Sequence, residues 1–166
     1  TQPTTHRHVR DGYFEFGSLL NFSASWASVG KEHLKNLRIR FTAKFGLRIN
    51  DDAYIGVGLR SAHFFANWGG FITYLNAKGK IILARPNDKL PLQYEDIILR
   101  EETKIDIDKD YTFDIKFDDS ELNIKIDEFN KVFKVDELPT VYGAGLVRFQ
   151  AYICRMHIKY LEINKL

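Results

Sequence analysis

The chain has 166 residues, enough for one domain with a sizeable core that needs no disulfide framework, and it contains a single cysteine, Cys154. Hydrophobic residues make up 45% and charged residues 28% of the chain, a balance that excludes disordered and collagen-like chains. The formal net charge of +2 argues against a protein held to nucleic acid by bulk electrostatics, and no apolar run approaches the roughly 20 residues of a membrane-spanning helix.

The start of the chain is polar. The run Thr1-Gln2-Pro3-Thr4-Thr5 lacks the basic and then apolar stretches of a signal peptide, so we expect a linker or tail over residues 1–10. A single domain should follow over residues 11–166. A module of a longer secreted or surface protein fits this start, and Asn21-Phe22-Ser23 matches the acceptor pattern for N-glycosylation. We therefore expect an extracellular or cell-surface location.

Alternation of apolar and polar residues predicts the first strands. Residues 37–45 alternate without a fault, which is typical of a strand buried on one face. Residues 53–60 alternate as well, with Tyr54, Gly56, Gly58 and Arg60 on the face opposite to Ile55, Val57 and Leu59. Residues 29–36 are the only segment for which we expect a helix, and it is short.

Turn residues mark the hairpins that follow. Strands over 71–75 and 80–85 flank the turn Asn76-Ala77-Lys78-Gly79, and residues 111–135 form a three-stranded meander. Residues 146–163 hold two more strands, with a change of parity near Arg155 and Met156 that predicts a bulge or turn. Ten or so short strands in one domain predict an all-β fold of two packed antiparallel sheets, a β-sandwich of jelly-roll type.

Five segments in this order resemble a known superfamily: the alternating strand 37–45, Gly56-Val57-Gly58-Leu59-Arg60, Trp68-Gly69-Gly70-Phe71, the strand 111–117 with its hairpin, and the closing strand 158–163. Together they resemble the concanavalin A-like lectin/glucanase domains, especially the laminin-G-like carbohydrate-binding modules of secreted glycosidases and surface proteins. The resemblance covers residues 11–166. It implies a sandwich that binds carbohydrate.

The sequence departs from this superfamily's catalytic and sugar-binding motifs. Neither Tyr94-Glu95-Asp96 nor the segment 101–106 has the acid spacing of the glucanase members. In galectins a Trp is followed by Glu and Arg, and these residues do not follow Trp68. We therefore find no recognisable catalytic carboxylate motif, while an irregular pair of acids stays open.

The run Asp106-Ile107-Asp108-Lys109-Asp110 resembles the start of a calcium loop. An EF-hand would need Gly where Tyr111 stands and a bidentate acid where Phe117 stands, so an EF-hand is excluded. Structural calcium is frequent in the superfamily, and a site of another kind stays open without assigned ligands. No other cofactor is indicated.

Sugar recognition needs an aromatic plane for the ring and planar hydrogen-bonding groups for the hydroxyls. The candidate binding residues on the polar face of the second sheet and its edge are Arg60, Trp68, Arg148, Gln150 and Tyr152. The arginines would clamp hydroxyl or carboxylate groups, Gln150 would donate and accept, and Trp68 or Tyr152 would stack on the ring. Two plainer interpretations stay open, namely a solvated sheet face for the row 148–152 and a core-capping role for Trp68.

We therefore expect a non-catalytic, lectin-like carbohydrate-binding module of a larger secreted or surface protein. Its partner would be a glycan or polysaccharide, and not nucleic acid or the membrane interior, with other domains of the parent chain as further partners. A protein-interaction or assembly domain is the first alternative and would show an exposed apolar patch. A glycoside hydrolase is the second and would bring two carboxylates about 5–10 Å apart into one cleft.

Overall fold

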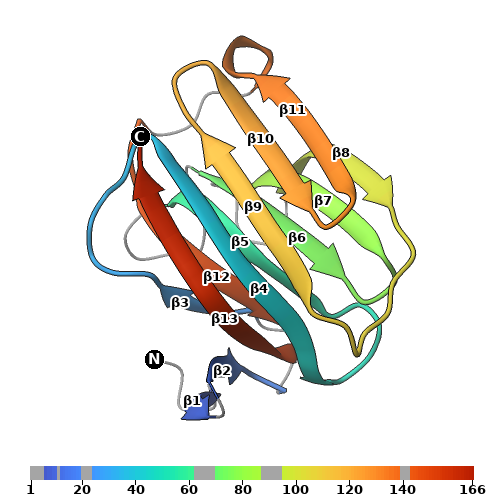
Figure 1. Cartoon of the computed structure of the whole chain (residues 1–166). Helices are drawn as coiled ribbons and strands as arrows, with labels where there is room; N and C mark the ends of the chain where they lie inside the picture. Colours follow the sequence, from blue (N-terminus) through green and yellow to red (C-terminus); the bar gives the residue numbers. More distant parts are fainter. Residues whose placement is uncertain (1–5, 11, 20–23, 62–69, 87–94, 139–142) are drawn as a thin grey trace.

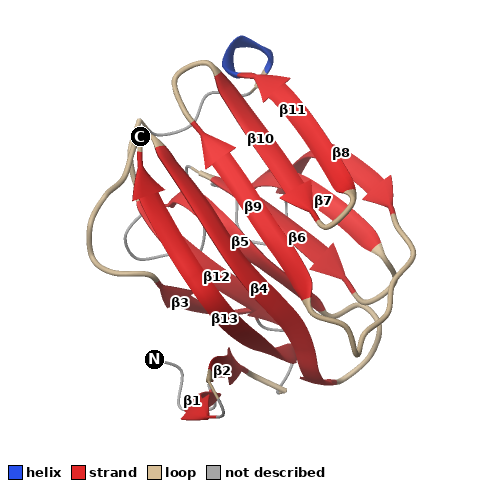
Figure 2. Ribbon diagram, viewed as in Figure 1, coloured by secondary structure: helices blue, strands red, loops and turns tan. Residues whose placement is uncertain are grey.

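Two antiparallel sheets packed face to face make up the fold, shown by a computed structural model that describes residues 6–10, 12–19, 24–61, 70–86, 95–138 and 143–166 (Figures 1 and 2). The seven-stranded sheet has the order β1 (His6–Arg10), β2 (Tyr13–Gly17), β13 (Cys154–Lys165), β4 (Leu37–Arg48), β9 (Tyr111–Phe117), β10 (Glu121–Ile126) and β11 (Phe129–Lys134). The six-stranded sheet has the order β3 (Ala24–Ser28), β12 (Leu146–Tyr152), β5 (Tyr54–Ser61), β6 (Phe71–Asn76), β7 (Lys80–Pro86) and β8 (Glu95–Glu102). A short 3-10 turn, η1 (Val135–Glu137), follows β11.

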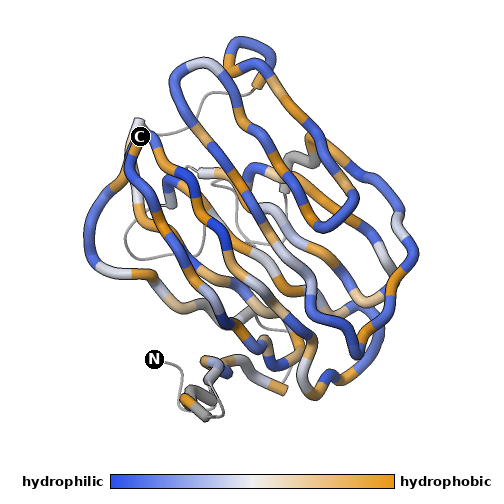
Figure 3. Tube along the Cα trace, viewed as in Figure 1, coloured by the Kyte–Doolittle hydropathy of each residue, from blue (hydrophilic) through white to orange (hydrophobic). Residues whose placement is uncertain are grey.

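The core lies between the sheets because each strand turns its apolar residues to the same side. On β4 and β9 the buried positions alternate with exposed or half-buried ones, and hydropathy alternates along the same strands in Figure 3. The ring of Phe41 stacks on Phe113 at 4.8 Å in its own sheet and meets Phe149 of the other sheet edge-on at 4.9 Å. The two-sheet antiparallel sandwich expected from the sequence is thus confirmed.

The turn chemistry read from the sequence also holds. β6 and β7 pair through the turn at residues 76–79, where Gly79 has φ +88° and the Asn76 side chain accepts from the backbone N–H of Lys78 at 2.9 Å. β9, β10 and β11 form the expected meander. The bulge expected near Arg155 and Met156 is present as a register shift between Cys154 and Met156.

The helix expected over residues 29–36 is wrong. Leu34 instead forms an isolated bridge with Gly145, donating its N–H to the Gly145 carbonyl at 2.8 Å. This segment is shorter than the roughly 12 residues that an isolated helix needs, so pairing with a distant strand satisfies its backbone better. Residues 6–10, expected within a tail, form β1 and pair with β2. In the described part of the chain, no helix is long and apolar enough to cross a membrane.

Candidate functional site

The outer face of the six-stranded sheet, turned away from the other sheet, carries the row predicted on β12. Arg148, Gln150 and Tyr152 alternate with Phe149 and Ala151, which belong to the core. Since side chains of a strand alternate between faces, the row points outward. The structure therefore brings three of the five predicted binding residues onto one face.

Two tyrosines that the prediction did not single out join this row. Tyr152 lies directly opposite Tyr54 of β5, with ring centroids 5.2 Å apart, and Tyr54 stacks on Tyr74 of β6 at 4.1 Å. We call Tyr152, Tyr54 and Tyr74 the tyrosine row. Gln150 donates a hydrogen bond from Nε2 to the Tyr54 hydroxyl oxygen at 2.6 Å, which ties the amide to the middle ring.

Gly56 makes this arrangement sterically feasible. It lies between Gln150 and Tyr74 in the register of β12, β5 and β6. A Cβ added at Gly56 would lie 2.2 Å from the Thr73 carbonyl oxygen and 2.6 Å from the Tyr74 Cβ, closer than atoms can approach. The missing side chain thus leaves the space in which the tyrosine row packs.

The floor of the outer face is apolar, and the polar side chains of Arg148 and Gln150 are buried in it. Ile72, Tyr74, Ile82 and Ala84 form a second apolar cluster, against which Tyr54 packs. Arg148 is 6% exposed and Gln150 is 5% exposed, whereas Tyr54 and Tyr152 are half-buried. Burial lowers the pKa of the Arg148 guanidinium. An approaching ligand would therefore meet Tyr54 and Tyr152 before it met Arg148 or Gln150.

Arg60 does not join this face. Its φ is +53°, and the pairing of β5 with β12 shifts register there, so a bulge removes Arg60 from the alternation that predicted its direction. Its guanidinium lies 3.8 Å from the ring centroid of Phe117 in the other sheet, and its Nε donates to the Lys35 carbonyl oxygen at 3.0 Å. Burial lowers the pKa of Arg60. These contacts give Arg60 a structural role between the sheets.

Trp68, the remaining predicted residue, lies outside the described residues. The sequence already contained the signal for Tyr54, because it occupies the same strand face as Gly56 and Gly58. Tyr74 could not be assigned in this way, since it lies in a strand buried on both faces, where alternation disappears.

Carboxylates, which hydrolysis or metal binding would need, do not lie on this part of the outer face. The outward positions of β12, β5 and β6 hold Arg148, Gln150, Tyr152, Tyr54, Gly56, Gly58, Ile72, Tyr74 and Asn76, none of them an acid. In the acidic run after β8, Asp106 accepts the backbone N–H of Asp108 at 3.0 Å, and Asp110 pairs with Lys159 at 3.4 Å. Over the described ranges, no three His, Cys, Asp or Glu side chains converge to hold a metal ion.

The single cysteine is not an activated nucleophile. Burial raises the pKa of the Cys154 thiol to about 12, and its Sγ lies 3.4 Å from the Tyr54 carbonyl oxygen. The thiolate is therefore negligible near neutral pH.

We compared the chain with known proteins by sequence and by structure. No protein-family model and no curated protein matches the chain by sequence. Solved structures do match it. The carbohydrate-binding module CBM66 from Bacillus subtilis is 12% identical, with a TM-score of 0.63 over 96% of this chain and 86% of that one. The laminarinase catalytic domain from Thermotoga maritima is 12% identical, with a TM-score of 0.64 over 100% and 82%.

A lectin shows the same likeness. The homodimeric agglutinin CG-16 from chicken liver is 10% identical, with a TM-score of 0.55 over 86% of this chain and all of that one. At such low identity the agreement is one of fold, and the fold is shared by carbohydrate-binding modules, lectins and glycoside hydrolases. With its two antiparallel sheets in this arrangement, the chain has the fold of the concanavalin A-like lectin and glucanase domains.

Proposed function

We propose that the chain is a non-catalytic carbohydrate-binding module that binds a glycan on the outer face of the six-stranded sheet. The observation that carries the proposal is the tyrosine row with Gln150 fixed to the Tyr54 hydroxyl at 2.6 Å. Rigid aromatic side chains with polar tips bind at low entropic cost, because they have few torsions to immobilise.

The residues of this face would have different roles in binding a glycan. Tyr152 stacks one ring face on Tyr54 and is half-buried, so part of its ring is exposed to a sugar. Tyr54 is flanked on both sides by tyrosines and offers its ring edge and hydroxyl. Gln150, at 5% exposure, acts as a positioning residue through its hydrogen bond to Tyr54. Arg148 supports the floor of the same face.

Binding is favoured over hydrolysis by the residue types on the face. Glycoside hydrolysis needs two carboxyl groups about 5–10 Å apart across the scissile bond. The outward positions of the adjacent strands β12, β5 and β6 carry no Asp or Glu. We further propose that the module belongs to a larger secreted or cell-surface protein, where a binding module of this kind would hold its parent chain to a polysaccharide.

A glycan array followed by calorimetry on the bound polysaccharide tests the proposal. We expect Tyr152→Ala to lower the affinity at least about tenfold, equivalent to about 1.4 kcal/mol, with a small change in Tm because Tyr152 is half-buried. Gln150→Leu should weaken binding less, by releasing the Tyr54 hydroxyl. Leu47→Ala is the control, since Leu47 is 62% exposed on β4 of the other sheet.

Two outcomes contradict the proposal. One is the absence of binding to any glycan at millimolar concentration. The other is equal affinity of Tyr152→Ala and Leu47→Ala for the bound glycan, which would move the site away from the tyrosine row. A protein ligand lost in Tyr152→Ala, without glycan binding by the wild type, would favour an assembly domain instead.

A further inference from the structure

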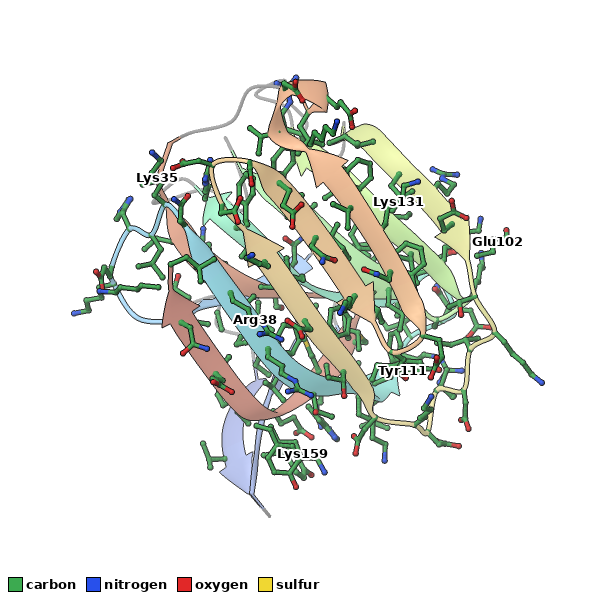
Figure 4. All side chains as sticks on the ribbon, turned by 45° about the horizontal axis from the view of Figure 1, so that its top comes forward. Lys35, Arg38, Glu102, Tyr111, Lys131 and Lys159 are labelled. Atoms are coloured by element: carbon green, nitrogen blue, oxygen red, sulfur yellow. The ribbon has the colours of Figure 1, made fainter. Side chains whose placement is uncertain are left out.

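The outer face of the seven-stranded sheet is basic, although the whole chain is nearly neutral. On β9, β10 and the part of β4 up to Lys44, the outward-facing charged residues are Arg38, Arg40, Lys44, Lys116 and Lys125 against Asp114 and Glu121. Figure 4 looks onto this sheet and shows Arg38 and Lys159 among its side chains. The excess of five cations over two anions exceeds the net charge of +2 of the entire chain.

Asp114, at the centre of this face, is surrounded by cations. It is opposite Arg40 of β4 and Lys125 of β10 in register, and Arg38 binds it with two hydrogen bonds of 2.9 and 2.7 Å. These hydrogen bonds, followed by the charges of Arg38, Arg40 and Lys125, hold the pKa of Asp114 below its usual value. The Asp114 carboxylate thus faces three cations, and both of its oxygens accept hydrogen bonds from Arg38 alone.

Arg40 and Lys125 are consequently left available to a ligand. Both are exposed, and neither has an ion-pair partner among the residues that the structure describes. Glu162, opposite Arg40 on β13, instead accepts a hydrogen bond from Asn164 at 3.0 Å. Neighbouring strands lie about 4.8 Å apart, so Arg40 and Lys125 are separated by roughly 10 Å across the sheet.

A bulge adds an aromatic ring to the same face. The pairing of β13 with β4 shifts register between Lys159 and Glu162, and Tyr160 has φ +56°, which is unusual for a residue other than glycine. The bulge leaves Tyr160 80% exposed, with the Lys159 ammonium 5.9 Å from its ring centroid. Strained residues kept in this way are frequent at binding sites.

We propose that this basic face, with Arg40, Lys125 and Tyr160, is a second binding surface, and that its ligand is an acidic polysaccharide bearing carboxylate or sulfate groups. Cations separated by a whole strand match an anion whose charges are separated by sugar rings. A DNA duplex presents one phosphate charge per about 1.7 Å of its axis, far denser than the roughly 10 Å between Arg40 and Lys125. An exposed tyrosine beside a lysine suits a sugar ring that carries an acid group.

Alginate and dextran sulfate are suitable probes, with unsubstituted dextran as the neutral comparison. We expect the wild type to bind both polyanions and not dextran, with affinity that falls as the salt concentration rises from about 50 to about 200 mM. Arg40→Gln/Lys125→Gln should weaken binding at least about tenfold and flatten the salt dependence. Tyr160→Ala should weaken it without changing the salt dependence.

The matched control is Lys31→Gln/Lys104→Gln, which removes the same two charges from exposed loop positions off this face. It should stay within about twofold of the wild type. Equal losses in the two double variants would show that net charge alone drives binding and would overturn the proposal. So would the absence of polyanion binding at low salt, or equally tight binding of duplex DNA or of phosphatidylserine vesicles.

This surface is independent of the tyrosine row on the other sheet. Tyr152→Ala should leave the affinity for alginate and dextran sulfate unchanged. Arg40→Gln/Lys125→Gln should leave the affinity for a neutral glycan unchanged. The two proposals can therefore fail separately.

Discussion

Arg60 shows how a single backbone torsion changes the role of a side chain. With φ at +53°, the residue leaves the alternation of β5 and places its guanidinium over Phe117. Gly70 and Gly145 lie against its backbone, where an added Cβ would come within 2.6 Å and 2.3 Å of Arg60 backbone atoms. The charge is held by the Lys35 carbonyl and by the aromatic face, both of which favour a cation.

We expect Arg60→Met to lower the free energy of unfolding by about 2 kcal/mol, since it removes a buried charged hydrogen bond and a cation–π contact while the apolar stem is kept. Urea denaturation measures this loss, and the affinity for a neutral glycan should not change. Arg100→Met, at an exposed arginine on β8, is the control and should shift stability by less than about 0.5 kcal/mol. Wild-type stability with weakened glycan binding would instead make Arg60 a ligand-contacting residue.

At the scale of an element, the turn between β9 and β10 depends on one carboxylate. Asp118 accepts hydrogen bonds from the Ser120 hydroxyl at 2.7 Å, the Ser120 N–H at 2.8 Å and the Glu121 N–H at 3.0 Å. These bonds, with the Ser120 hydroxyl first, lower the pKa of Asp118 far below its usual value. Because the turn joins two strands of the meander, its geometry sets the register of Phe117 against Leu122.

We expect Asp118→Asn to cost about 1 kcal/mol of unfolding free energy near neutral pH, a value reduced by the solvent exposure of the turn. The lowered pKa means that the contribution is present above the unfolded value of about 4 and is lost as pH falls through the lower folded value. The stability gap between wild type and variant should therefore be constant above about pH 5 and close below about pH 4. A gap that stays constant down to pH 2 would contradict this, and Glu128→Gln in the next turn is the control.

At the scale of the whole molecule, Phe41 links the two sheets. It is fully buried, stacks on Phe113 within the seven-stranded sheet and meets Phe149 of the six-stranded sheet. Most of the large buried side chains on both sheets belong to one cluster with Phe41, so separation of the sheets would expose most of the core.

We expect Phe41→Ala to lower the free energy of unfolding by about 3–5 kcal/mol, because it removes a ring from a packed core and leaves a cavity. Far-UV circular dichroism should report the backbone and near-UV circular dichroism the packing of the aromatic side chains, and the two midpoints should coincide. Val132→Ala, at a residue 45% exposed on β11, should cost less than about 0.5 kcal/mol. Separate midpoints for the two signals would show that the sheets unfold independently.

Properties that depend only on neighbouring residues were readable from the sequence by itself. Alternation placed β4 and β9 with their core faces, Gly79 marked the hairpin of β6 and β7, and the directions of Arg148, Gln150 and Tyr152 on β12 follow from the same period of two. These features together suffice for the sandwich, because apolar strand faces can be buried only against one another.

Properties that depend on which distant strands become neighbours were decided by the tertiary structure alone. Tyr54 stacks between Tyr74 and Tyr152 only because β5 lies between β12 and β6, and Gly56 leaves the rings room. Residues 29–36 do not form a helix because Leu34 pairs with Gly145 in an isolated β-bridge. Arg60 and Tyr160 leave the alternation at bulges, and Arg60 is held by contacts with Phe117 and Lys35, which no local pattern encodes.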